Sequence, residues 1–112
     1  MNVRFDSKSL RLRLNSEEFF ILESEGTFSE TLSFTSKETL KWNLTATSSE
    51  HAAFERTDSE LNFSVPAAAV AELSRKWKEN SGKKDLAVNF ALPNLMVFLE
   101  IDYFAKKKGM DN

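Results

Sequence analysis

Residues 10–14, Leu10-Arg11-Leu12-Arg13-Leu14, alternate leucine with arginine without a break. Strict alternation of apolar and charged residues is typical of a β-strand that buries one face. The shorter run Val3-Arg4-Phe5 alternates in the same way, and Asp6-Ser7-Lys8-Ser9 between the two runs supplies turn-forming residues. When Phe5 faces Leu10, all five apolar side chains lie on one face. This stretch therefore predicts a β-hairpin with one buried face.

The same signals continue along the chain and predict six further strands and two helices. Asn15 and Glu18 have the spacing of a capping box, so they begin the first helix, and Gly26 ends it. Pro66 is placed for the first turn of the second helix. One helix follows the second strand and the other follows the sixth. The predicted strands cover residues 3–5, 10–14, 28–34, 40–45, 52–56, 61–65, 86–92 and 95–103.

This order is ββαββ followed by ββαββ, and the two halves are similar in sequence. Residues 6–14 align with residues 57–65 without a gap, and residues 40–44 correspond to residues 95–99 after a small gap. We interpret the halves, residues 1–47 and 51–104, as an internal duplication. The alternative is that any two amphipathic hairpins align this well.

The predicted fold class is α+β within a single domain, residues 1–112. Two ββαββ halves related by a pseudo-twofold axis would form a mainly antiparallel sheet or an eight-stranded barrel, with two covering helices. Residues 105–112 are charged and are expected to be a frayed tail.

Composition excludes several classes of protein. The 112 residues are 41% hydrophobic and 29% charged, which fits a globular chain and not a disordered one. A net charge of −2 disfavours a dedicated binder of nucleic acid or of anionic membranes. The chain has no cysteine and one histidine, which excludes thiolate chemistry and multi-histidine metal centres. No apolar run is long enough for a bilayer or a signal peptide, so we expect a cytoplasmic protein without a membrane partner.

Three arginines form the most distinct local feature. The hairpin register places Arg4 beside Arg11, with Arg13 two positions along on the same outer face. One interpretation is an anion site for phosphate, a nucleic-acid backbone or an acidic partner. The favoured interpretation is that acidic residues on a neighbouring strand neutralise the arginines. Glu100 and Asp102 are the candidates, since they share one face of the last strand.

The acidic pair, Glu100 and Asp102, also has a chemical interpretation. Two carboxylates can bind a hard cation or exchange protons with a substrate. No calcium-loop motif and no glycine-rich phosphate loop accompanies them, so we favour a structural role and expect no metal and no cofactor.

The last strand is apolar on both faces. Met96, Phe98 and Phe104 alternate with the residues that are predicted to be buried. Such a strand is covered on both sides, either by the second helix or by another subunit. These three residues are therefore the candidate interface of a homodimer.

Three segments carry a resemblance to a family of small, uncharacterised bacterial proteins, a domain of unknown function. They are the R-x-x-x-x-x-L-R-L-R-L hairpin that begins at Arg4, the run from Ala53 to Pro66 before an alanine-rich helix, and the acidic strand Leu99-Glu100-Ile101-Asp102-Tyr103. Members of that family continue into an acidic tail, where this chain has Ala105-Lys106-Lys107-Lys108. The resemblance implies no activity, substrate, cofactor or catalytic residue.

Three functional hypotheses follow. The leading one is a non-catalytic binding or assembly module that associates with itself; the sequence does not identify another protein partner. The second is an anion or nucleic-acid binder that uses Arg4, Arg11 and Arg13, although the charge balance disfavours nucleic acid. The third is an enzyme with a site in a barrel mouth or between the halves. No residue pattern supports the enzyme directly, so it is the least favoured.

Overall fold

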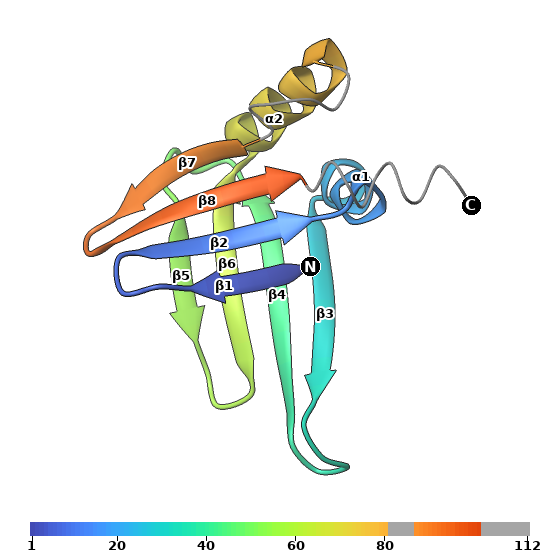
Figure 1. The fold of residues 1–112 in the computed structure, drawn as a ribbon, viewed down its shortest axis with the longest axis vertical. Helices are drawn as coiled ribbons and strands as arrows, with labels where there is room; N and C mark the ends of the chain where they lie inside the picture. The colour runs from blue at the N-terminus through green and yellow to red at the C-terminus, as the bar shows by residue number, and fades with distance from the viewer. Residues whose placement is uncertain (81–86, 102–112) are drawn as a thin grey trace.

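The computed structural model describes residues 1–80 and 87–101 (Figure 1). The described residues form eight strands and two helices in the predicted order. The elements are β1 (Asn2–Phe5), β2 (Ser9–Leu14), α1 (Ser16–Glu25), β3 (Thr27–Ser33), β4 (Thr39–Thr47), β5 (Ala53–Arg56), β6 (Glu60–Pro66), α2 (Ala67–Asn80), β7 (Ala87–Leu92) and β8 (Leu95–Ile101). Asp102, Phe104 and the predicted frayed tail lie outside the described residues.

The strands form two four-stranded sheets. Sheet A has the order β1-β2-β8-β7, and sheet B has the order β3-β4-β6-β5. The outer pairs of each sheet are antiparallel hairpins, whereas the central pairs, β2 with β8 and β4 with β6, are parallel. The α+β class is confirmed, with both sheets mixed.

The barrel alternative is wrong, because the described strands form two separate sheets and no closed barrel. Each hairpin pairs with a hairpin of the other half through its inner strand, β2 with β8 and β4 with β6. The outer strands β1, β7, β3 and β5 therefore end as the edges of the two sheets.

The two sheets face each other across one hydrophobic core. Figure 1 shows the strands of sheet A crossing over those of sheet B, as in an orthogonal sandwich. The alternating leucines of β2 point inward, and Leu12 and Leu14 have no exposed surface. The core also takes side chains from both helices and all four central strands; its largest fully buried members are Phe19, Leu10, Leu12, Leu14, Leu22, Leu44, Leu73, Leu99 and Val65.

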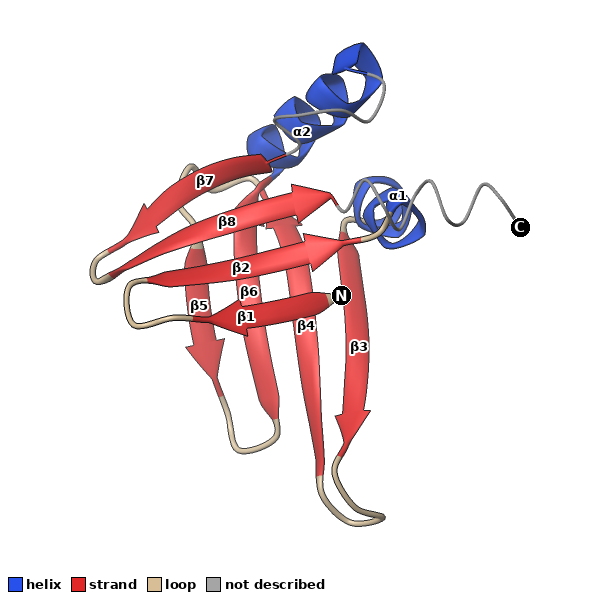
Figure 2. Ribbon diagram, in the orientation of Figure 1, coloured by secondary structure: helices blue, strands red, loops and turns tan. Residues whose placement is uncertain are grey.

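The helices lie where β2 leads into β3 and where β6 leads into β7 (Figure 2). Helix α1 begins with the predicted capping box: Glu18 N donates to Asn15 Oδ1 at 2.8 Å, and Asn15 N donates to Glu18 Oε1 at 2.9 Å. It ends at Gly26, whose φ of 81° favours glycine. Buried Phe19 meets the ring of Trp77 edge-on at 6.2 Å, which joins α1 to α2.

Two aromatic residues beside the core are not fully buried. Trp42 is half-buried against the core. Phe5 pairs with Leu10 on the inner face, as the alternation predicted, yet 57% of its surface is exposed. The expectation of a buried Phe5 is wrong because Phe5 is the last residue of β1 and lines an open hollow instead of the core.

The pairing of the strands is symmetric between the two halves. Each strand of the first half, β1 to β4, has an equivalent in the second half, β5 to β8. When equivalent strands are exchanged, the order β1-β2-β8-β7 of sheet A becomes β5-β6-β4-β3, which is the order of sheet B read in reverse. Leu12 pairs with Leu99, and the aligned residues Phe63 and Leu44 pair with each other. The register in both sheets therefore follows the alignment of the sequence. This symmetry is what two repeats would produce, and the duplication itself stays a prediction.

The amino group of Met1, just before β1, forms ion pairs with two carboxylates. It contacts Glu18 at 2.5 Å and Glu30 of β3 at 2.8 Å. Burial alone would lower the pKa of this amine, but the hydrogen bonds and charges of the two carboxylates outweigh burial and raise its pKa. Strand β1 is thus held at this end against α1 and sheet B.

Candidate binding site

The outer face of sheet A carries the three predicted arginines. Arg4 pairs with Arg11 across β1 and β2, and Arg13 pairs with Glu100 across β2 and β8. Glu100 bridges two of them: its Oε2 lies 2.5 Å from Arg11 Nη1, and its Oε1 lies 3.2 Å from Arg13 Nε. Only 12% of the Glu100 side chain is exposed. The largely buried carboxylate of Glu100 therefore forms ion pairs with two guanidinium groups.

The remaining space between the arginines is small. Asn2, Arg4, Arg11 and Arg13 line a hollow of about 30 Å³, which has room for about one water molecule. Arg4 is exposed and makes no ion pair within residues 1–80 and 87–101. This geometry supports neutralisation by Glu100 over an anion site, while the role of the three arginines stays a prediction.

The predicted interface residues on this face are only partly exposed to solvent. Met96 is 39% exposed, whereas Phe98 is half-buried with the Arg11 guanidinium 4.3 Å from its ring centre. The arginine covers the ring in a cation–π contact. Phe104 and Asp102, the third interface candidate and the second member of the acidic pair, lie outside the described residues.

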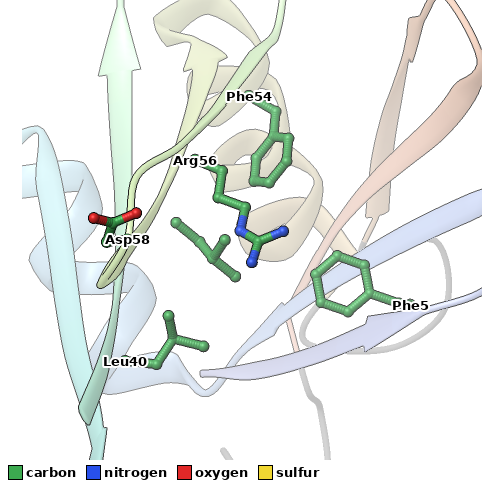
Figure 3. A pocket seen from close by; sticks show the side chains of 6 residues that line it. Phe5, Leu40, Phe54, Arg56 and Asp58 are labelled. Atoms are coloured by element: carbon green, nitrogen blue, oxygen red, sulfur yellow. The ribbon is translucent and has the colours of Figure 1, made fainter. Parts of the chain in front are cut away.

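A larger hollow, which the sequence did not predict, lies at the Phe5 end of β1, where the chain turns towards β2. It has a volume of about 350 Å³, and we call it the groove. Phe5 and Phe54 are 57% and 40% exposed and border it from the two sheets (Figure 3). Its lining comes from β1, β4, β5, β6 and the β5–β6 turn: Phe5, Leu40, Phe54, Arg56, Asp58 and Leu61.

Strand β5 supplies both an aromatic wall and a cation to the groove. Phe54 pairs with Phe63 and Arg56 pairs with Leu61, so both side chains lie on the inner face of sheet B. The ring of Phe54 stacks on that of Phe63 with centroids 5.1 Å apart and an interplanar angle of 22°. Figure 3 shows the Arg56 guanidinium pointing into the space between Phe54 and Phe5, with Asp58 on the opposite side.

One signal in the sequence pointed to this groove. In the strand over residues 52–56, Phe54 and Arg56 share a face, so a charged side chain occupies an inward position. An arginine on an inward face indicates that this part of the sheet is not covered by apolar packing. Alternation alone did not show which strand covers it.

The described residues contain neither a cluster suited to a metal ion nor a helix suited to a membrane. No group of three or more His, Cys, Asp or Glu side chains in residues 1–80 and 87–101 is placed to hold a metal ion. Neither described helix has the length and apolarity needed to cross a bilayer.

The sequence of the chain matches the model of a protein family. Residues 1–108 match the model of a family described as a family of unknown function, DUF7009. This confirms the resemblance to a domain of unknown function, whereas the bacterial source and the hairpin motif stay predictions. No curated protein matches the chain.

Proposed function

The chain belongs to the DUF7009 family, and we propose that it is a non-catalytic protein that binds an apolar small molecule in the groove. The observation that carries this proposal is the pair of exposed phenylalanines, Phe5 and Phe54, on either side of a hollow of about 350 Å³. Pockets that hold small ligands have volumes of roughly 300–1,000 Å³ and mostly apolar walls. The groove therefore has the size for a small ligand.

The walls of the groove are held in place before a ligand arrives. Phe54 is fixed by its stack on buried Phe63, and Leu61 is itself part of the core. Preformed walls lower the conformational entropy that binding costs. The polar lining consists of one arginine and one aspartate, Arg56 and Asp58, and the described lining residues include no serine, cysteine or histidine. This lining favours binding over catalysis.

A neutral fluorescent dye, Nile red, tests this proposal. We expect saturable binding to one site, because the dye would bury the faces of Phe5 and Phe54. Phe54→Ala and Phe5→Ala should each weaken binding about tenfold, since each ring contributes about 1.5–3 kcal/mol when fully buried. Two variants are used because Phe54 also contacts Phe63, whereas Phe5 lies at the end of β1.

Phe20→Ala is the matched control, because Phe20 is 65% exposed on α1 and does not line the groove. It should leave dye binding unchanged. Dye affinity that is equal in all four proteins, or no dye binding by the unsubstituted protein, would refute the proposal.

Self-association through the outer face of sheet A is a second candidate, supported by the 39% exposure of Met96 beside Phe98. We expect the mass in solution to be that of a dimer and Met96→Glu to return it to that of a monomer, because the substitution would bury a charge. Phe20→Glu adds the same charge elsewhere and should leave the dimer intact. A monomeric mass at every protein concentration contradicts this candidate.

A further inference from the structure

We propose that the ligand of the groove is an amphipathic monocarboxylate, and that Arg56 binds its carboxylate while Phe5, Leu40 and Phe54 bind its apolar body. This inference rests on the proposed function and adds the chemical class of the ligand.

Arg56 has no charged partner among the described residues. Its guanidinium carries five N–H donors. It makes no ion pair and no side-chain hydrogen bond to any residue in the described parts of the chain. Yet it sits on the inner face of sheet B, two residues after Phe54, and points between two aromatic rings (Figure 3). The side chain is exposed on this edge strand, so the guanidinium is open to a ligand, and a carboxylate matches its planar donors with two parallel bonds.

The other arginines are placed differently. Arg11 and Arg13 share Glu100, Arg75 pairs with Glu79 at 3.1 Å, and Arg4 lies on the outer face of sheet A and does not line the groove. Among the described residues, Arg56 is thus the arginine that lines an apolar hollow without a protein carboxylate on it. This combination is what an anionic ligand in the groove requires.

Asp58 limits the negative charge that a ligand of the groove can carry. Asp58 lines the same groove, and Figure 3 shows its carboxylate on the side away from the Arg56 guanidinium. One guanidinium compensates one negative charge, and the Asp58 carboxylate repels a second one. The groove therefore favours a monoanion over a dianion such as a phosphate monoester.

The two halves of the chain contribute different side chains to the groove. Phe5 and Arg56 occupy equivalent positions in the alignment of the halves, one residue before the aligned segments 6–14 and 57–65. Both side chains line the groove, so its β1 side carries an aromatic ring without a charge, whereas its β5 side carries a cation beside Phe54. A ligand with one apolar end and one charged end matches this arrangement, with its carboxylate towards β5 and its body towards β1.

Decanoate and 1-decanol form a suitable pair of probes, because they share a chain length and differ in charge at pH 7. Their affinities can be measured by displacement of Nile red or by calorimetry. We expect decanoate to bind about tenfold more tightly, which corresponds to one charge-assisted interaction. Arg56→Ala should remove this difference and leave the affinity for 1-decanol unchanged. Arg56→Lys should keep part of it.

Two further variants separate charge at the site from charge elsewhere. Asp58→Asn should tighten decanoate binding several-fold without changing 1-decanol binding, because it removes the repulsion. Arg4→Ala removes the same charge as Arg56→Ala from an exposed position on the opposite side of sheet A, so it should have no effect.

The outcomes distinguish this inference from the proposed function. Nile red binding with equal affinities for decanoate and 1-decanol overturns the monocarboxylate and leaves the groove as an apolar site. An Arg56→Ala variant that weakens both probes equally overturns it too, since the arginine would then act only through its aliphatic stem. A failure of all three probes to bind refutes the proposed function itself. A second copy of this chain in the groove would compete with the probes. Probe binding would then weaken as the protein concentration and the mass in solution rise, and this result would overturn the inference.

Discussion

Truncating Leu12 to alanine is expected to lower the free energy of unfolding by about 2–5 kcal/mol, a large share of the stability of a domain of this size. Leu12 has no exposed surface and lies in the middle of β2, between Val3 of β1 and Leu99 of β8. The cavity it would leave is enclosed by both sheets, so the surrounding side chains have little freedom to fill it. Denaturant unfolding followed by circular dichroism measures the change.

Phe5→Ala is the control for this prediction. Phe5 lies on the same face of the same hairpin but is 57% exposed, so its loss should cost well under half of the Leu12 value. Equal losses of stability in the two variants would mean that the inner face of β1 and β2 is not covered by sheet B in the way the structure shows.

The hairpins and the helix ends were predictable because they depend on neighbouring residues. Alternation over residues 10–14 determines which side chains share a face, and a short turn then aligns the two strands of a hairpin. The predicted pairing of Arg4 with Arg11 is therefore found in β1 and β2. The capping box at Asn15 is equally local, since both of its hydrogen bonds span three residues.

The parallel pairing of β2 with β8 was not predictable in the same way. These strands are more than eighty residues apart in the sequence. Alternation gives a strand an inward face but no preferred partner, and the last strand is apolar on both faces. Two separate sheets and a closed barrel satisfy the same pattern, and only the long-range pairing distinguishes them.

The groove could not be predicted from the alternation of residues, for a related reason. Alternation placed Phe5 on the inner face, and the structure has it there, but the pattern does not show whether another sheet reaches that end of the strand. Arg56 on an inward position of β5 was the available sign that coverage ends here. An interruption of the apolar face by a charged side chain is thus more informative about a site than the apolar residues around it.

Replacing Glu100 with glutamine is expected to lower the free energy of unfolding by about 1–2 kcal/mol. Its carboxylate is 12% exposed and bridges Arg11 and Arg13, whose own side chains are 39% and 45% exposed. Hydrogen bonds to charged groups contribute about 1.5–3 kcal/mol when buried and less when solvent screens them. Glutamine keeps the shape but leaves the arginines without a compensating charge. Glu79→Gln removes the same charge from an exposed pair with Arg75, so it should change stability little.

Glu100→Gln also tests whether Glu100 neutralises the three arginines on the outer face of sheet A, Arg4, Arg11 and Arg13. The unsubstituted protein should bind heparin negligibly at physiological salt, because Glu100 already occupies the space between two of the three arginines. Glu100→Gln should bind heparin with an affinity that falls steeply with salt, and adding Arg11→Ala to it should reduce the number of released counterions by about one. Glu79→Gln should not acquire this binding. Tight heparin binding by the unsubstituted protein, abolished by Arg11→Ala alone, would instead make Arg4, Arg11 and Arg13 a functional anion site, since one carboxylate would then have failed to offset the field of three guanidinium groups.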